Sequence, residues 1–430
     1  MKLRTPSPDQ LAGLVLDEAS IQSPERHHLE YTVKVITPIY GGGVIAGEPD
    51  EDMPIRATAI RGQLRFWWRL LQMHGPEQLT DTALFEKERA IWGGMGGSET
   101  GDDAKDHSSK VFIRTKIDSD VDVRKAPVTK FSENIALPGL AYALFPDIQN
   151  DQYLISQEAL SFTLSISAKI NEDNPVDWKS VKDAVRWWAS FGGIGARTRR
   201  GLGAVDVEGL ECISSEEANQ FGCKLKQFGG SPDAIKAWNT SINKLREFRQ
   251  GVNVGRNKAR DPSDTKKLGR SFWPEPDSIR EITGRHSTNK PIKISGVDRK
   301  TNDHSPVHEA RISFPRAAFG LPIIFDFNVP KAVGEPAKTE LSPVGSERMA
   351  SPLILKPMAL GGQKYASIAL LLPVGHLETL SLELNEGNAN LRTLSANEWW
   401  STSKATAVDP ISKNGGTDAL TAFLNYFGGQ

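Results

Sequence analysis

The arrangement of apolar and polar residues along this chain predicts alternating strands and helices. Residues 30–39, LEYTVKVITP, alternate apolar and polar positions with the period of a half-buried strand. VFIRTKI at 111–117 and LSFTLSIS at 160–167 are further strands, and a fourth should follow a glycine-rich segment within 192–210. Between these strands, the long segments that do not resemble loops repeat apolar residues at helical spacing.

Two segments of the first half repeat apolar residues at helical spacing. The first helix is expected over 58–74, with Thr58 as its N-cap, and the second over 177–191, capped by Asp177. One apolar face of the first helix consists of Ile60, Leu64, Trp67 and Leu71. A neighbouring stripe consists of Arg61, Arg65, Trp68 and Gln72.

Strand, helix, two strands, helix and strand is the order of a ferredoxin-like βαββαβ unit, so the fold class is α+β. The second half begins with a long helix over 233–250. The polar stretch over 251–310 is expected to be a long insertion or mobile arm. Strand-like runs follow at RISFPRA, LPIIFDFNV, SPLILKPM and ASIALLL. A short helix over 417–428 closes the chain. We expect a tail over 1–29, a first domain over 30–215 and a second over 216–430.

Composition narrows the classes of function. The formal net charge of the 430 residues is −1, so any basic surface for nucleic acid must be local. Two cysteines, Cys212 and Cys223, do not make a disulfide framework or a four-cysteine zinc site, and a reducing, cytoplasmic location is expected. No stretch of about 20 apolar residues is present to cross a bilayer.

The first candidate binding site lies on the helix at 58–74 and just before it. Its members are Arg56, Arg61, Arg65 and Arg69. No acidic residue occurs between Asp52 and Glu77, so their charge lacks a local partner and predicts contact with phosphate, which the arginine fork grips well. The alternative is a solvated helix face whose arginines meet carboxylates elsewhere in the fold. Tryptophan pairs at 67–68 and 187–188 could stack on bases, but core packing explains them better.

The second candidate is the segment FGGIGARTRRGLGAV at 191–205. It combines Gly192, Gly193, Gly195, Gly201 and Gly203 with Arg197, Arg199 and Arg200. Glycines let the backbone approach a ligand closely, and bare N–H groups can cradle phosphate. The segment lacks the P-loop pattern and follows a helix, which excludes a dinucleotide fingerprint. A tight turn is the alternative, and we favour RNA contact.

The remaining signals are weaker. A polar arm over 246–270 either clamps RNA or is a solvated loop; its cations are Arg246, Arg249, Arg256, Lys258, Arg260, Lys266, Lys267 and Arg270. His304 and His308 have the spacing of a helical metal pair, but Pro306 between them argues against a helix. We therefore expect no metal, no cofactor and no catalytic residue.

Three sequence features resemble the RAMP proteins of CRISPR systems, in particular subunit one of the type III-B, or Cmr, effector complex. They are TPIYGGG (37–43) with IRATAIRGQLRFWWR (55–69), the segment 191–205 as a glycine-rich loop, and FPRAAFGLPIIF (314–325) with RMASPLILKPM (348–358). The resemblance spans roughly residues 30–370. The insertions at 93–109 and 251–310 depart from it.

The resemblance implies two ferredoxin-like, RRM-like domains and a non-catalytic subunit of a ribonucleoprotein. Such a subunit would hold crRNA near its 3′ end and help capture complementary target RNA in antiviral defence. Its partners would be a neighbouring terminal RAMP subunit and the backbone RAMP subunits. Two alternatives remain open. One is a metal-independent CRISPR RNA-processing endonuclease, with His27 or His28 as general base; the other is a purely architectural subunit.

Overall fold

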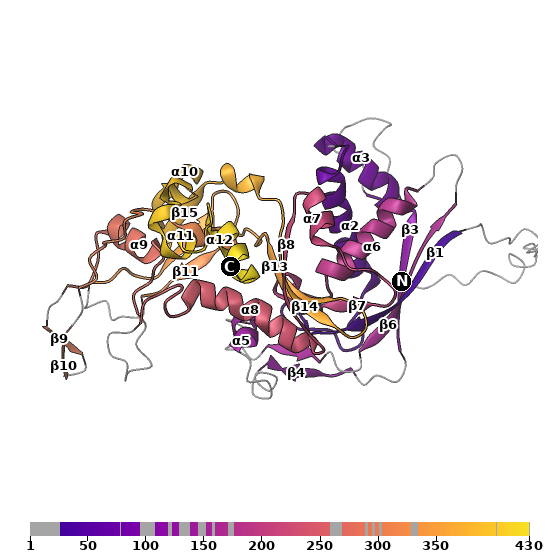
Figure 1. Cartoon of the computed structure of the whole chain (residues 1–430), viewed down its shortest axis with the longest axis horizontal. Helices are drawn as coiled ribbons and strands as arrows, with labels where there is room; N and C mark the ends of the chain where they lie inside the picture. The colour runs from indigo at the N-terminus through magenta and orange to yellow at the C-terminus, as the bar shows by residue number, and fades with distance from the viewer. Residues whose placement is uncertain are drawn as a thin grey trace, which may run out of the picture.

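The computed structural model describes residues 26–77, 79–94, 108–118, 123–128, 138–144, 152–156, 160–170, 176–258, 269–288, 291–294, 297–300, 303–327, 334–400 and 402–429. Figure 1 shows an elongated molecule in which the first half of the chain lies at one end and most of the second half at the other. Among the described residues no helix is both long and apolar enough to span a bilayer.

The first half forms the predicted ferredoxin-like unit. Its elements are β1 (Arg26–Val35), α2 (Ala57–His74), α3 (Asp81–Trp92), β3 (Val111–Ile117), β6 (Ser161–Lys169), α6 (Trp178–Phe191) and β7 (Val205–Val207). The strands make one sheet in the order β3-β6-β1-β7, with each adjacent pair antiparallel. This is the βαββαβ arrangement expected from the sequence, with α3 added between α2 and β3.

Two boundaries differ from the prediction. The first strand begins at Arg26, because β6 is long enough for Lys169 to pair with it, and ends at Val35. Residues 39–40 form a separate strand, β2 (Ile39–Tyr40), which joins β5 (Tyr153–Ile155) and β4 (Lys125–Pro127) in a small sheet. The N-cap of α2 is Arg56 and makes no side-chain cap, so the assignment of Thr58 was wrong; Asp177 does cap α6.

The core of this half lies between the sheet and its helices. All four paired tryptophans are about 1% exposed or less, which confirms core packing for them. Trp68 was expected on the arginine stripe of α2, but it is buried, and its indole Nε1 donates to Ser180 Oγ at 2.9 Å. The buried face of α2 is therefore wider than the sequence pattern indicated, because α6 packs beside it.

The second half also begins as strand, helix and two strands. Its principal elements are β8 (Lys224–Ser231), α8 (Ala234–Gln250), β13 (Leu353–Ala359), β14 (Tyr365–Leu371) and α12 (Ala419–Gly428). The sheet order is β13-β14-β8. A second sheet, in the order β11-β12-β15-β16, consists of Ile323–Phe325, Thr339–Pro343, Leu382–Glu386 and Ala389–Leu394.

Several short elements complete the described part of the chain. They are α5 (Pro138–Leu144), α7 (Ser215–Gln220), α9 (Glu275–Thr283), β9 (Pro291–Ile294), β10 (Val297–Lys300), α10 (Ala396–Trp399), α11 (Asp409–Ser412) and the 3-10 helices Thr198–Arg200, Pro315–Phe319, Gly375–Glu378 and Thr402–Ala407. The strand-like reading of RISFPRA was wrong, because Pro315 starts one of these 3-10 helices. The insertion contains α9 and a hairpin within its described residues.

The β13–β14 pair joins the two halves. Ile354 and Ile368 belong to the core of the first half, whereas Leu355 and Leu371 belong to the core built on α8 and α12. Figure 1 shows β8, β13 and β14 at the centre of the molecule. Because β13 and β14 are buried on both faces, the segment SPLILKPM is a nearly continuous apolar run. The proposed limits of the two domains stay a prediction.

Candidate nucleic-acid interface

The two glycine-containing motifs of the first half lie against each other. Backbone N–H groups of Ala196 and Gly203 donate to the carbonyls of Tyr40 (2.6 Å) and Pro38 (2.8 Å). The buried Thr37 hydroxyl bridges the same segments, since it donates to the Gly201 carbonyl and accepts from the N–H of Ala204, 167 residues away. TPIYGGG and the segment 191–205 therefore form one unit in the fold.

The glycines of this segment are required by packing inside the protein. Gly203 has φ +62°, and a Cβ there would lie 1.9 Å from the Ile194 carbonyl oxygen. A Cβ on Gly195 would meet the Tyr40 carbonyl at 2.6 Å, and one on Gly201 would meet the Trp238 ring at 2.4 Å. Gly192 and Gly193 are equally confined, by Trp188 and by Gly203. The close approach that these glycines allow is to neighbouring backbone and rings of the protein, and RNA contact by this segment stays a prediction.

Three arginines project from this segment, and two of them, Arg199 and Arg200, contact the second half. Arg197, in the left-handed region, donates to the Ala143 carbonyl at 2.8 Å. Arg199 donates to the Ser351 carbonyl, and its guanidinium lies 5.6 Å above the Phe66 ring. Arg200 donates to the carbonyls of Leu353 (3.0 Å) and Phe319 (3.3 Å). The acceptors are partial charges on the backbone, which hold the guanidinium groups without neutralising them.

The result is a concentration of positive charge, which we call the loop cluster: Arg197, Arg199, Arg200 and Arg249. Burial, together with the charges of the other three arginines, lowers the pKa of Arg200 to about 10. Burial also lowers the pKa of Arg199. Within the described residues, neither Arg199 nor Arg200 forms an ion pair with a carboxylate. Like charges held together this way would be stabilised by an anion such as phosphate.

The helix arginines are arranged differently. Nε of Arg65 and Nε of Arg69 each contact one carboxylate oxygen of Glu88, at 2.6 Å, and the Glu88 side chain is only 3% exposed. Arg56 forms an ion pair with Asp50, and Arg61 donates to the Trp92 carbonyl. The premise that this row lacks acidic partners was therefore wrong, because α3 and the preceding loop supply them. RNA contact by these arginines stays a prediction.

A buried cation that the sequence analysis did not single out lies beside the loop cluster. Lys356 of β13 is fully buried, and its ammonium donates to the Gly192 carbonyl at 2.7 Å, at the C-terminal end of α6. Burial lowers the pKa of Lys356 to about 7. A single lysine in the apolar run LILKPM was the signal that could have identified it.

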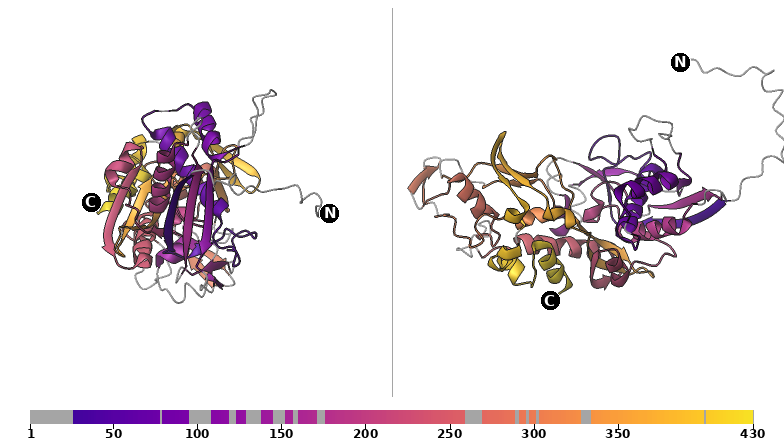
Figure 2. Two further views of the ribbon diagram at one scale, coloured as in Figure 1. Left: turned by 90° about the vertical axis from the view of Figure 1, so that its right-hand side faces the viewer. Right: turned by 90° about the horizontal axis from the view of Figure 1, so that it is seen from above.

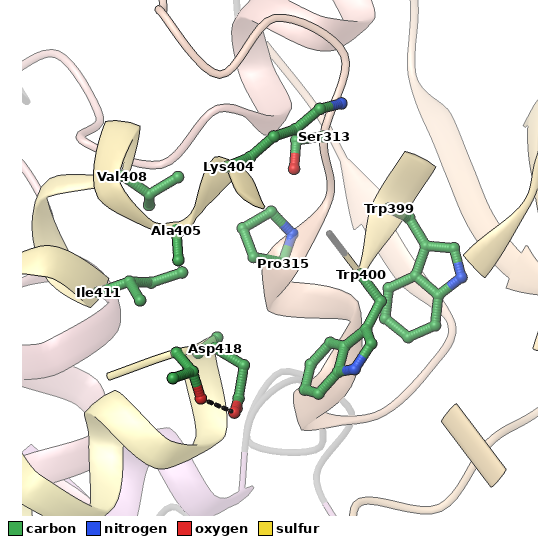
Figure 3. A pocket seen from close by; sticks show the side chains of 11 residues that line it. Ser313, Pro315, Trp399, Trp400, Lys404, Ala405, Val408, Ile411 and Asp418 are labelled. Atoms are coloured by element: carbon green, nitrogen blue, oxygen red, sulfur yellow. Dashed lines mark hydrogen bonds between the residues drawn. The ribbon is translucent and has the colours of Figure 1, made fainter. Parts of the chain in front are cut away.

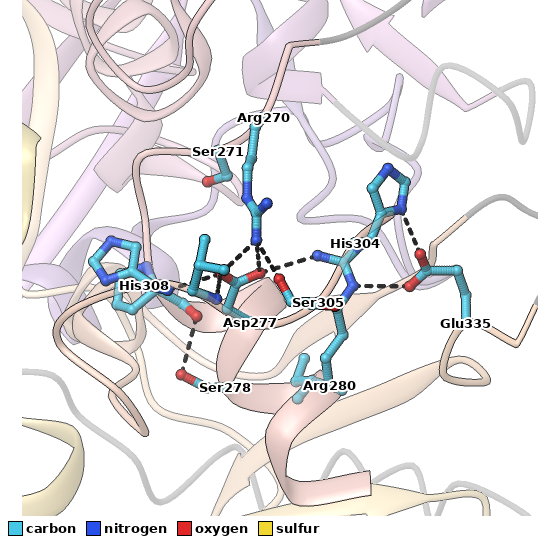
Figure 4. Close-up of polar contacts among 12 residues, drawn as sticks. Arg270, Ser271, Asp277, Ser278, Arg280, His304, Ser305, His308 and Glu335 are labelled. Carbon is cyan, nitrogen blue, oxygen red and sulfur yellow. Dashed lines mark hydrogen bonds and ion pairs between the residues drawn. The ribbon is translucent and has the colours of Figure 1, made fainter. Parts of the chain in front are cut away.

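Arg270 of the polar arm and the cations of the segments that follow it serve local contacts. Arg270 pairs with Asp277 at 2.8 Å, Arg280 bridges Asp277 and Glu335, and His304 contacts Glu335 (Figure 4). Residues 303–308 are not helical, and His308 Nε2 lies 3.0 Å from the Phe272 carbonyl instead. Arg260, Lys266 and Lys267 lie outside the described residues. These ion pairs and hydrogen bonds hold α9 against the neighbouring described segments.

Other features offer little for chemistry. In the described part of the chain no group of three histidine, cysteine or acidic side chains is arranged to hold a metal ion. A small cavity between Trp399, Trp400, Lys404 and Ile411 (Figure 3) encloses only about 10 Å³, room for at most one water molecule. The two cysteines are free, and burial raises the pKa of Cys223 to about 12.

Comparison with known proteins yields a match of part of the chain to one family model, and matches to several solved structures. No curated protein matches the chain. Structures with similar folds include Cmr1 from Pyrococcus furiosus in its apo form, with 13% identity, 82% of this chain and 90% of that chain covered, and a TM-score of 0.42. A chain of the type III-B Cmr-beta complex bound to cognate target RNA has 13% identity, 81% and 95% coverage, and a TM-score of 0.40.

The sequence profile of the RAMP superfamily matches residues 32–206. This range runs from within β1 to within β7, and it contains both the helix arginines and the glycine-rich segment. The matched range thus coincides with the ferredoxin-like unit described above. We conclude that residues 32–206 in the first half of the chain form a RAMP domain.

Proposed function

We propose that this chain is a non-catalytic, RNA-binding subunit of a type III-B CRISPR effector complex. The observation that carries the proposal is the loop cluster, where Arg199 and Arg200 bring positive charge together without carboxylates. Phosphate oxygens are the anions that such guanidinium groups bind best. The family assignment and the sequence resemblance to Cmr subunit one support the type of complex.

In this proposal the loop cluster holds the RNA backbone, and neighbouring RAMP subunits of the complex continue the RNA path. The RNA would be crRNA near its 3′ end, with the complementary target captured alongside, and the site of action would be the cytoplasm. Phosphate contacts position RNA without reading its sequence. A subunit of this kind therefore accepts any guide.

Affinity purification of the tagged chain, expressed with its sister subunits, tests the proposal. The wild-type chain should retain a small RNA of defined length together with the other subunits. The variant Arg199→Ala with Arg200→Ala should retain less RNA. Purification without RNA, or RNA retention that does not depend on these arginines, would contradict the proposal.

A metal-independent nuclease on the same fold is the competing function. His27 and His28 do not serve it, because the strand rise of about 3.3 Å per residue places them about 30 and 26 Å from Ile36, which follows β1 and bonds to the glycine-rich segment. Among the described histidines, His376 has a pKa that is lowered by partial burial and by the charge of Arg199. Labelled RNA should survive incubation with the wild-type chain. Cleavage that His376→Ala abolishes would favour the nuclease.

A further inference from the structure

The sheet of the RAMP domain carries its helices on one face. Along β6, Phe162, Leu164 and Ile166 are buried in the core. The residues that alternate with them are polar and only partly buried: Ser161, Thr163, Ser165 and Ser167. Figure 2 (left) views this end of the molecule, and the strands there lie in front of the helices. The outer face of the sheet is thus an open surface in the described part of the chain.

The strand register places side chains on this outer face in rows. The rows are Phe112–Ser167–His28, Arg114–Ser165–Glu30 and Lys116–Thr163–Thr32. A column of hydroxyl groups therefore runs along the centre of the face, with cations and one aromatic ring on the β3 side. Phe112 is 43% exposed, so its ring is accessible to a stacking partner from solvent.

One end of the face concentrates positive charge. Arg26 and Lys169 are directly paired across β1 and β6, an arrangement that destabilises a sheet by repulsion. The Arg26 guanidinium lies 5.5 Å from the centre of the Phe112 ring. Among the described residues, no carboxylate forms an ion pair with Arg26, Lys169, Arg114 or Lys116. An anion seated beside the ring would remove the repulsion.

We propose that this outer face is a second binding surface for single-stranded RNA, distinct from the loop cluster. One base stacks on Phe112, and phosphates contact Arg26, Lys169 and Arg114. Ser165 Oγ donates to Glu30 and Ser161 Oγ donates to Asp118, so the hydroxyl groups of Thr163 and Ser167 are the ones that donate to phosphate or ribose oxygens. Aromatic rings and cations on an open four-stranded sheet suit unpaired bases, whereas a protein partner would call for more apolar surface than Phe112 alone. The inference rests on the proposed RNA-binding function.

Binding of a short fluorescein-labelled oligouridine to the purified full-length chain tests the inference. Phe112→Ala should weaken binding about tenfold, the usual loss of one stacked base. Arg114→Glu with Lys169→Glu should lower the slope of log affinity against log salt concentration by about 1.4, for two lost phosphate contacts. The matched controls are Phe85→Ala on α3, 45% exposed, and Lys224→Glu with Lys226→Glu, exposed on β8. They should bind as the wild type does.

The outcomes separate this inference from the proposed function. If the wild type binds RNA and the face variants bind as tightly as their controls, the inference is overturned and the loop cluster remains. If the face variants bind RNA normally but lose a co-expressed sister subunit, the surface docks protein and the inference is equally overturned. Loss of binding only in Arg199→Ala with Arg200→Ala would also place all RNA contact at the loop cluster. Thermal melts confirm that every variant is folded.

Discussion

The helix arginines and the loop cluster carry the same side chains but differ in what balances their charge. Arg65 and Arg69 share the buried carboxylate of Glu88. Arg199 and Arg200 contact only backbone carbonyls and rings among the described residues. A run of arginines in a sequence can therefore serve either structure or binding, and the hydrogen-bond acceptors that the fold places beside it decide which.

The difference has an energetic basis. Breaking a buried ion pair leaves a charge without compensation and is costly, so the helix arginines are expected to stabilise the fold. A guanidinium group that is hydrogen-bonded to a carbonyl oxygen keeps its net charge, and its other N–H groups can still bind phosphate. We therefore expect the helix arginines to stabilise the fold and the loop cluster to bind RNA.

The largest expected effect is on stability, at the helix. Arg65→Ala with Arg69→Ala leaves Glu88 buried without a partner, and should lower the free energy of unfolding by about 3–5 kcal/mol. Urea denaturation measures it. Lys87→Ala is the control, because its pair with Glu77 is exposed on both sides and contributes at most about 1 kcal/mol. Equal stability of the two variants would break the comparison.

The glycine-rich segment gives the next effect. Gly203→Ala forces a Cβ against the Ile194 carbonyl and a left-handed backbone on alanine, and should cost about 3 kcal/mol. Gly209 has φ +77° with open space around it, so Gly209→Ala isolates the backbone strain at about 1 kcal/mol. Thermal denaturation of both variants measures the difference. Similar losses would mean that close packing at Gly203 is unimportant.

Lys356 gives a smaller effect that depends on pH. Its pKa of about 7 in the folded protein lies below the value of about 10.4 in the unfolded chain. Between these values the unfolded state binds more protons, so stability rises with pH. Relative to Lys356→Met, the wild-type free energy of unfolding should rise by about 2 kcal/mol from pH 7 to pH 9. Parallel curves for the two proteins would show that the ammonium is not desolvated.

The sequence predicted the architecture of the RAMP domain well, because that architecture depends on periodicity. Alternation identified β3 and β6, and the helical spacing identified α2 and α6 to within a few residues. The 3-10 helix at Pro315–Phe319 was missed because a short apolar run with one proline does not distinguish a turn from an edge strand.

The electrostatics could not be predicted in the same way. Glu88 lies 19 residues from Arg69, on another helix, and no spacing rule connects them. The acceptors of Arg199 and Arg200 are carbonyls 152 and 153 residues away, and every residue type supplies a carbonyl. Candidate residues were visible in the sequence, but the partners that decide their roles come from the tertiary fold.

The salt dependence of RNA binding tests the central claim most directly. Arg199→Ala with Arg200→Ala should lower the slope of log affinity against log salt concentration by about 1.4, the value for two phosphate contacts on a single strand. The matched variant replaces Arg65, Arg69 and Glu88 together by methionine, which removes the whole ion-pair network without stranding a charge. It should leave the slope unchanged. A lower slope in the methionine variant, with an unchanged slope in the loop variant, would contradict the account.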